Sequence, residues 1–112
     1  TDDIRSSAAV DIIRAIQKEG AKVRVYDPKA MKKAAGALNK TVTFCNDAYS
    51  ASKGSDCLLV LTDWDEFKEL DFLKIKKLLK RPVILDGRNI YDPQEMRKLG
   101  FTYESIGRKS KD

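Results

Sequence analysis

Apolar residues recur along the chain in two periods, one typical of helices and one typical of strands. Ser6 or Ser7 can cap a helix start, and the apolar residues that follow are spaced as on one helical face until Gly20. Residues 21–26 then alternate apolar and polar, which predicts a strand that ends at an Asp-Pro turn. The predicted helical face consists of Ala9, Val10, Ile12, Ile13 and Ile16.

The middle of the chain continues the alternation of helix and strand. Residues 29–38 predict a short helix interrupted by Gly36, and residues 41–44 a short strand. A helix follows from Asn46 or Asp47 to about residue 53. Residues 57–62 are continuously apolar, which is typical of a strand buried on both faces of a parallel sheet.

The last third of the chain predicts two more strands. Residues 63–80 are helical in pattern, in one or two pieces, and residues 82–85 form another buried strand. A helix over residues 93–99 starts with proline in its first turn, and residues 101–103 form a final edge strand. This order predicts an α/β domain with a mostly parallel sheet of about five strands, covered by helices on both faces. A doubly wound unit starts with a strand, whereas this chain starts with a helix.

Composition limits the chemistry that the chain can perform. Its 112 residues suit one domain, and no apolar run approaches the ~20 residues of a membrane span. The chain has no histidine, the commonest general base and metal ligand, and we expect neither a catalytic residue nor a metal site. Cys45 and Cys57 lie beside apolar residues and are interpreted as small core residues in a reducing, cytoplasmic compartment.

The net charge of +5 has two interpretations. An excess of Lys and Arg attracts anions such as phosphates or nucleic acids, but it is also common on a merely solvated surface. Aromatic residues do not interleave with the basic ones as a base-stacking platform requires. The sequence therefore argues against a nucleic-acid partner.

The ends of the predicted strands are the candidate ligand site, because open α/β sheets bind ligands there. Asp86-Gly87-Arg88-Asn89 follows a buried strand, and its arginine could bind a diphosphate or pair with a nearby carboxylate. Arg5, before the first helix, could likewise reinforce an anion site or pair with a neighbouring aspartate. Asp27 is interpreted as a turn residue, and Trp64 as a pocket cover, a subunit contact or a local lid.

Several blocks of this sequence resemble the UDP-glucose/GDP-mannose dehydrogenase family. The first block is similar to the family segment Thr-Asp-Asp-Ile-Arg-Glu-Ser, and the blocks keep their order and spacing over nearly the whole chain. They are Thr1-Asp2-Asp3-Ile4-Arg5-Ser6-Ser7, Gly20-Ala21-Lys22-Val23, Tyr26-Asp27-Pro28, Ala51 to Asp56, Leu61-Thr62-Asp63-Trp64-Asp65-Glu66-Phe67, Leu85-Asp86-Gly87-Arg88-Asn89 and Gly100 to Arg108.

The resemblance implies a Rossmann-like three-layer sandwich. Residues 1–112 are identified as the family's C-terminal UDP-sugar-binding domain, a fragment of an enzyme that oxidises the sugar C6 alcohol to a carboxylate in two NAD-dependent steps. The match implies that Arg88 contacts the nucleotide sugar and that Arg5 approaches the NAD side of the cleft. It also implies that NAD is bound mainly by another domain, that the catalytic cysteine lies elsewhere in the polypeptide, and that the enzyme is a homodimer or larger.

The sequence departs from the family pattern at two places. Ser6 stands where the family usually has Glu, and the family's first strand, which ends in Phe-Lys, does not precede Thr1. We therefore expect a sheet that lacks this strand and a fragment that is inactive alone. The competing hypothesis is a non-catalytic α/β module that binds a protein or nucleic acid.

Overall fold

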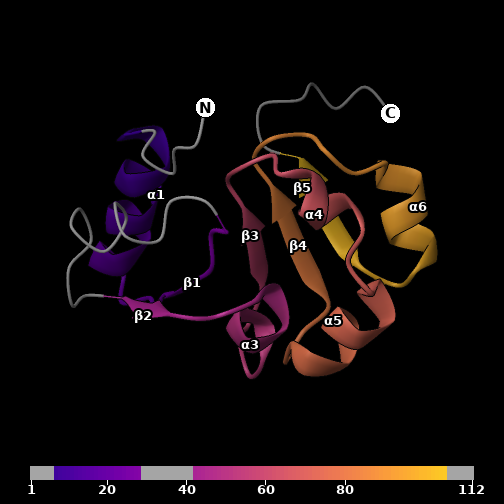
Figure 1. Ribbon diagram of the computed structural model, residues 1–112, viewed down its shortest axis with the longest axis horizontal. Helices are drawn as coiled ribbons and strands as arrows, with labels where there is room; N and C mark the ends of the chain where they lie inside the picture. Colours follow the sequence, from indigo (N-terminus) through magenta and orange to yellow (C-terminus); the bar gives the residue numbers. More distant parts are fainter. Residues whose placement is uncertain (1–6, 29–41, 106–112) are drawn as a thin grey trace. The chain divides into compact units, whose positions relative to one another are not determined.

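A computed structural model of the chain describes residues 7–28 and 42–105 (Figure 1). The chain divides into two compact units, Thr1–Ala51 and Ser52–Asp112, and each is described by itself. The predictions made for Arg5 and for a helix over residues 29–38 lie outside the described residues.

The first unit opens with the predicted amphipathic helix. Helix α1 spans Ser7–Lys18 and buries Ala9, Val10 and Ile13, which belong to the predicted apolar face. The chain leaves this helix through Gly20, whose φ of +95° lies in the left-handed region that glycine adopts without a steric cost. The helix and its stop are therefore confirmed.

A short parallel pair of strands completes the described part of this unit. Strand β1, Arg24–Val25, pairs with β2, Thr43–Phe44, and Val25 is buried while Arg24 is exposed. Helix α3, Ala48–Ser52, begins after an Asp47 carboxylate that accepts a hydrogen bond from the Ser50 N–H at 2.7 Å. Both strands are shorter than their sequence patterns predicted.

The second unit is built on a three-stranded parallel sheet. Its strands are β3, Leu58–Val60, β4, Val83–Asp86, and β5, Thr102–Ser105, and Figure 1 shows β4 between the other two. Helices α4, Asp65–Lys68, and α5, Phe72–Leu78, connect β3 to β4. Helix α6, Pro93–Lys98, connects β4 to β5, which is the predicted edge strand.

The core of this unit lies between its sheet and its helices. Ile75 of α5 and Ile84 of β4 are fully buried, and the Phe72 ring meets the Tyr91 ring edge-on at a centroid distance of 5.2 Å. Burial of each such side chain stabilises the fold by about 1.5–3 kcal/mol. The buried side chains of this unit also include Met96, Phe101 and Tyr103.

The structure confirms the predicted α/β class with parallel strands. The pattern over residues 63–80 resolves into two helices, because the Asp71 carboxylate accepts the Lys74 N–H at 3.1 Å and caps a new helix start. Strand β3 differs from the prediction of burial on both faces, since Leu58 and Leu59 are only half-buried. It lies at an edge of the three-stranded sheet, where a strand has a neighbour on one side only.

Candidate functional site

The carboxyl ends of β3, β4 and β5 meet at one edge of the sheet, because all three strands run parallel. The loop after β3, residues 61–64, and the turn after β4, residues 87–91, are in direct contact there. The Gly87 N–H donates a hydrogen bond to the Val60 carbonyl at 2.8 Å. This edge is the position at which open α/β sheets bind ligands.

Gly87 allows the two loops to approach this closely. A Cβ atom at this position would lie 3.1 Å from the Val60 carbonyl oxygen and 3.3 Å from a methyl carbon of Leu61. Both distances are tighter than ordinary van der Waals contact, so a larger residue would force the loops apart. The glycine of the predicted turn is therefore required by close packing.

The Asp86 carboxylate organises the turn from inside the protein. Its side chain is fully buried, and one oxygen, Oδ1, accepts the Arg88 N–H at 3.0 Å. The other oxygen, Oδ2, accepts the Ile90 N–H at 2.9 Å and the Tyr91 N–H at 3.0 Å. A short polar side chain that binds the amides following it is the usual device for fixing such a turn.

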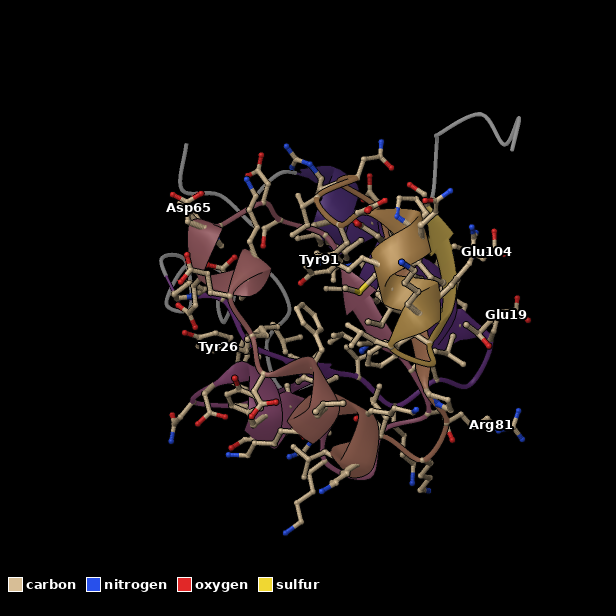
Figure 2. The ribbon with its side chains drawn as sticks, turned by 90° about the vertical axis from the view of Figure 1, so that its right-hand side faces the viewer. Glu19, Tyr26, Asp65, Arg81, Tyr91 and Glu104 are labelled. Carbon is tan, nitrogen blue, oxygen red and sulfur yellow. The ribbon has the colours of Figure 1, made fainter. Side chains whose placement is uncertain are left out.

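Two tyrosines surround this carboxylate. The Tyr103 hydroxyl donates to Asp86 Oδ2 at 2.7 Å, and the Tyr91 hydroxyl donates to the Phe67 carbonyl at 2.6 Å. Figure 2 shows Tyr91 turned into the interior, where it is 6% exposed. Burial, followed by the Asp86 carboxylate and Tyr103, raises the pKa of Tyr91, so this residue stays a neutral hydrogen-bond donor.

Arg88 leaves the turn toward solvent and pairs with the loop after β3. Its guanidinium lies 3.2 Å from Asp63 Oδ2, and the two side chains are 45% and 59% exposed. The sequence left open whether Arg88 binds a diphosphate or pairs with a nearby carboxylate, and the structure contains the pairing with a carboxylate. A single contact between half-exposed charges contributes only about 0–1 kcal/mol, and it uses one of the five N–H donors of the guanidinium.

Asn89 gives the turn its shape. Its φ of +57° is the left-handed conformation, which asparagine tolerates better than most residues. The Ser105 hydroxyl at the end of β5 hydrogen-bonds to the side-chain oxygen of Asn89. The turn that carries Arg88 is thus tied to β5 at two places, through Tyr103 and through Ser105.

The structure also describes Trp64, the last residue of the loop after β3, and three other candidates from the sequence. Trp64 is half-buried directly before α4, and Asp27 is buried after β1. Cys45 is a buried free thiol, and burial and then Asp56 raise the pKa of Cys57, which disfavours its thiolate.

The described part of the chain also bears on metal binding and membrane insertion. No group of three His, Cys, Asp or Glu residues in residues 7–28 and 42–105 is arranged to hold a metal ion. No helix within these ranges is long and apolar enough to cross a membrane.

The role of the Asp86 carboxylate and of its tyrosine partner was not predicted. An Asp-Gly pair after a strand indicates a turn fixed by the aspartate side chain. The contacts of Asp86 to Arg88, Ile90 and Tyr91 could therefore have been predicted from neighbouring residues in the sequence. The hydrogen bond from Tyr103 spans 17 residues and depends on the register of β5, which the sequence pattern does not give.

Comparison with known proteins agrees with this geometry. Residues 1–93 match the sequence model of the UDP-glucose/GDP-mannose dehydrogenase family, UDP binding domain. The chain is 47% identical over 108 residues to the UDP-glucose 6-dehydrogenase TuaD of Bacillus subtilis, covering 96% of this chain and 23% of that protein. It is 43% identical over 108 residues to the UDP-glucose 6-dehydrogenase of Rhizobium meliloti, covering 96% of this chain and 24% of the relative.

A solved structure shares the fold over nearly the same length. The NDP-N-acetyl-D-galactosaminuronic acid dehydrogenase of Methanosarcina mazei aligns with a TM-score of 0.76 and 30% identity, over 96% of this chain and 22% of that chain. This chain therefore spans about a quarter of the length of the relatives that it matches. The match over residues 1–93 confirms the resemblance noted in the sequence: the chain belongs to the UDP-glucose/GDP-mannose dehydrogenase family, in which it corresponds to the UDP-binding domain.

Proposed function

We propose that this chain binds the nucleotide diphosphate of a UDP-sugar as the C-terminal domain of an NAD-dependent dehydrogenase that oxidises the sugar C6 alcohol to a carboxylate. The family match and the UDP-glucose 6-dehydrogenases among its relatives support this proposal. They favour it over a non-catalytic module for proteins or nucleic acids. The observation that carries it is the arginine-bearing turn held rigidly at the ligand-binding edge of the sheet.

In this proposal the Arg88 guanidinium contacts the diphosphate. The backbone N–H groups of residues 87, 88, 90 and 91 are already bound to Val60 or Asp86, so the turn cannot offer them to a phosphate. The positive side chain is then the group with which this turn attracts an anion. A bidentate contact to phosphate is stronger than the single exposed contact to Asp63, so a ligand can displace that carboxylate.

The chain's part in the reaction is to bind and orient the substrate. It lacks the Gly-rich fingerprint that holds a dinucleotide, so its residues do not fit a complete NAD site. We propose that NAD binds mainly to another domain, with Arg5 at the boundary of the cleft, and that the catalytic cysteine is supplied from elsewhere in the enzyme. NAD accepts hydride in this chemistry.

We further propose that the enzyme works as a homodimer or a larger oligomer in the cytoplasm. Two cysteines without a disulfide fit a reducing compartment. The remainder of the same polypeptide and a UDP-sugar are its proposed partners.

Replacement of Arg88 tests the proposed contact. In the full-length enzyme, Arg88→Ala should lower kcat/KM for UDP-glucose at least tenfold, because a charge-assisted hydrogen bond is worth about 1.5–3 kcal/mol. The measurement is steady-state NADH formation with UDP-glucose varied at saturating NAD. Arg88→Lys should recover part of the loss, since a lysine keeps the charge without the planar fork.

Arg81→Ala is the matched control. Arg81 precedes β4 at the opposite end of the strand, and Figure 2 shows its side chain pointing away from the protein. The same loss of one positive charge there should leave kcat/KM unchanged. If the two variants behave alike, or if Arg88→Ala keeps wild-type kinetics, the assignment of Arg88 is wrong.

A further inference from the structure

The turn that carries Arg88 is anchored to the last strand by two side chains, Tyr103 and Ser105. Strand β5 pairs with β4 in a register that places Tyr103 beside Ile84 and Ser105 beside Asp86. Side chains two positions apart in a strand point to the same face of the sheet. Asp86 is two positions after Ile84, so its side chain lies on the same face as Tyr103.

We propose that β5 positions the substrate-binding arginine: Tyr103 acts through the Asp86 carboxylate, and Ser105 acts through Asn89. This inference rests on the proposed role of Arg88 in binding the diphosphate. It makes Tyr103 and Ser105 positioning residues, since neither is required to touch the ligand.

The Tyr103 hydroxyl joins the two ends of the turn. It donates to Asp86 Oδ2 at 2.7 Å and lies 3.3 Å from the Tyr91 carbonyl oxygen. The ring is 1% exposed, so packing fixes the position of the hydroxyl. The residue directly before the turn and the last residue of the turn are therefore held to one rigid group.

The Asp86 carboxylate, which Tyr103 holds in place, in turn fixes the backbone N–H of Arg88. The oxygen that receives the Tyr103 hydroxyl and the oxygen that receives the Arg88 N–H belong to one planar group. Rotation of that group about its Cβ–Cγ bond would break both contacts together. With Tyr103 in place, the backbone of Arg88 has one orientation, and its side chain starts from a fixed point.

Ser105 applies a second constraint to the same turn. Its hydroxyl contacts the side-chain oxygen of Asn89, the residue with the left-handed φ of +57° that directly follows Arg88. Side chains of β5 therefore hold Asp86, before the arginine, and Asn89, after it. Such fastening matters for binding because misplacement of a charged group by about 1 Å is enough to weaken its contact with a ligand.

The test is a set of kinetic variants of the full-length enzyme. Tyr103→Phe removes one oxygen atom and keeps the buried ring. We expect it to raise KM for UDP-glucose about three- to tenfold, with kcat and KM for NAD unchanged, since the lost contact orients a binding group only. In an Arg88→Ala background the same substitution should change KM no further, because its effect passes through Arg88.

Tyr91→Phe is the matched control for stability. It removes a hydroxyl from the same core, but that hydroxyl donates to the Phe67 carbonyl and not to Asp86. The Tyr91 N–H contact to Asp86 is kept. This variant should lower the melting temperature and raise KM for UDP-glucose less than Tyr103→Phe does, which separates loss of stability from loss of positioning.

Each remaining outcome decides between the proposals. An unchanged KM in folded Tyr103→Phe, or an increase that adds fully to that of Arg88→Ala, overturns the positioning role. An unaffected Arg88→Ala overturns the proposed role of Arg88, on which this inference rests. If Tyr103→Phe does not fold, Ser105→Ala at the half-buried end of β5 replaces it, with the same required rise in KM and the same non-additivity with Arg88→Ala.

Discussion

Asp86→Asn is the most informative single change for the architecture of the turn. The substitution keeps the size of a fully buried side chain and removes its charge. In the wild-type chain Oδ2 receives the Ile90 N–H, the Tyr91 N–H and the Tyr103 hydroxyl, and Oδ1 receives the Arg88 N–H. An amide supplies one acceptor oxygen where the carboxylate supplied two.

The free-energy cost follows from where that oxygen is placed. The better orientation puts it at the Oδ2 position, where three donors converge, and leaves the amide NH2 facing the Arg88 N–H. One hydrogen bond is then lost at a cost of about 1–3 kcal/mol, and the other three change from charge-assisted to neutral. A neutral amide is also cheaper to bury than a carboxylate, which offsets part of this loss. We expect a net destabilisation of about 2–4 kcal/mol.

Urea unfolding of the 112-residue chain measures this cost. Fluorescence of Trp64, the single tryptophan, and far-UV circular dichroism follow the transition. Asp92→Asn is the matched control, because the exposed Asp92 carboxylate accepts only a 3.3 Å contact from Gln94 at the start of α6. It should cost less than about 1 kcal/mol. Surface substitutions usually change the free energy of unfolding by less than about 0.5 kcal/mol. If the value for Asp86→Asn lies within that margin of the wild-type value, the hydrogen-bond reasoning is refuted.

Two further predictions concern the neighbours of this turn. The pKa of Tyr91 is raised above its ordinary value of 10.0, so its stabilising contribution is complete below pH 10. Above pH 10 unfolding releases the Tyr91 proton, and the free energy of unfolding should fall by up to about 1.4 kcal/mol per pH unit. Urea unfolding at a series of alkaline pH values should show a shallower fall for Tyr91→Phe than for the wild-type chain. Equal slopes for the two chains would contradict the raised pKa of Tyr91. Gly87→Ala should destabilise the chain by about 1–3 kcal/mol, because its Cβ would lie 3.1 Å from the Val60 carbonyl oxygen. If the free energy of unfolding of Gly87→Ala in urea equals that of the wild-type chain, the claim that close packing requires glycine at this position is wrong.

The sequence predicted the class of the fold because its main signals are local. The helix of residues 7–18 follows from the spacing of its apolar residues and from Gly20, and the position of the turn after β4 follows from an Asp-Gly pair behind an apolar run. Strand lengths were less predictable, since β3 ends where its pairing with β4 ends. Pairing depends on a partner that is distant in sequence.

The candidate site was predicted in part for the same reason. Arg88 was identified because a strand-end turn is a local feature and because open sheets bind ligands there. Its pairing with Asp63 and the contact of Tyr103 with Asp86 join residues 25 and 17 positions apart. Such contacts arise from strand order and register, which hydrophobic periodicity does not encode.

The anchoring of the turn by β5 also bears on how the domain matures during synthesis. A ribosome releases β4 and Arg88 before it releases Tyr103, because the chain emerges from its N-terminus. Until β5 has emerged and paired, the Asp86 carboxylate lacks its tyrosine partner. A nascent chain that ends between the two strands thus carries the arginine without the strand that anchors its turn, so the proposed ligand-binding edge is completed only when the final strand docks.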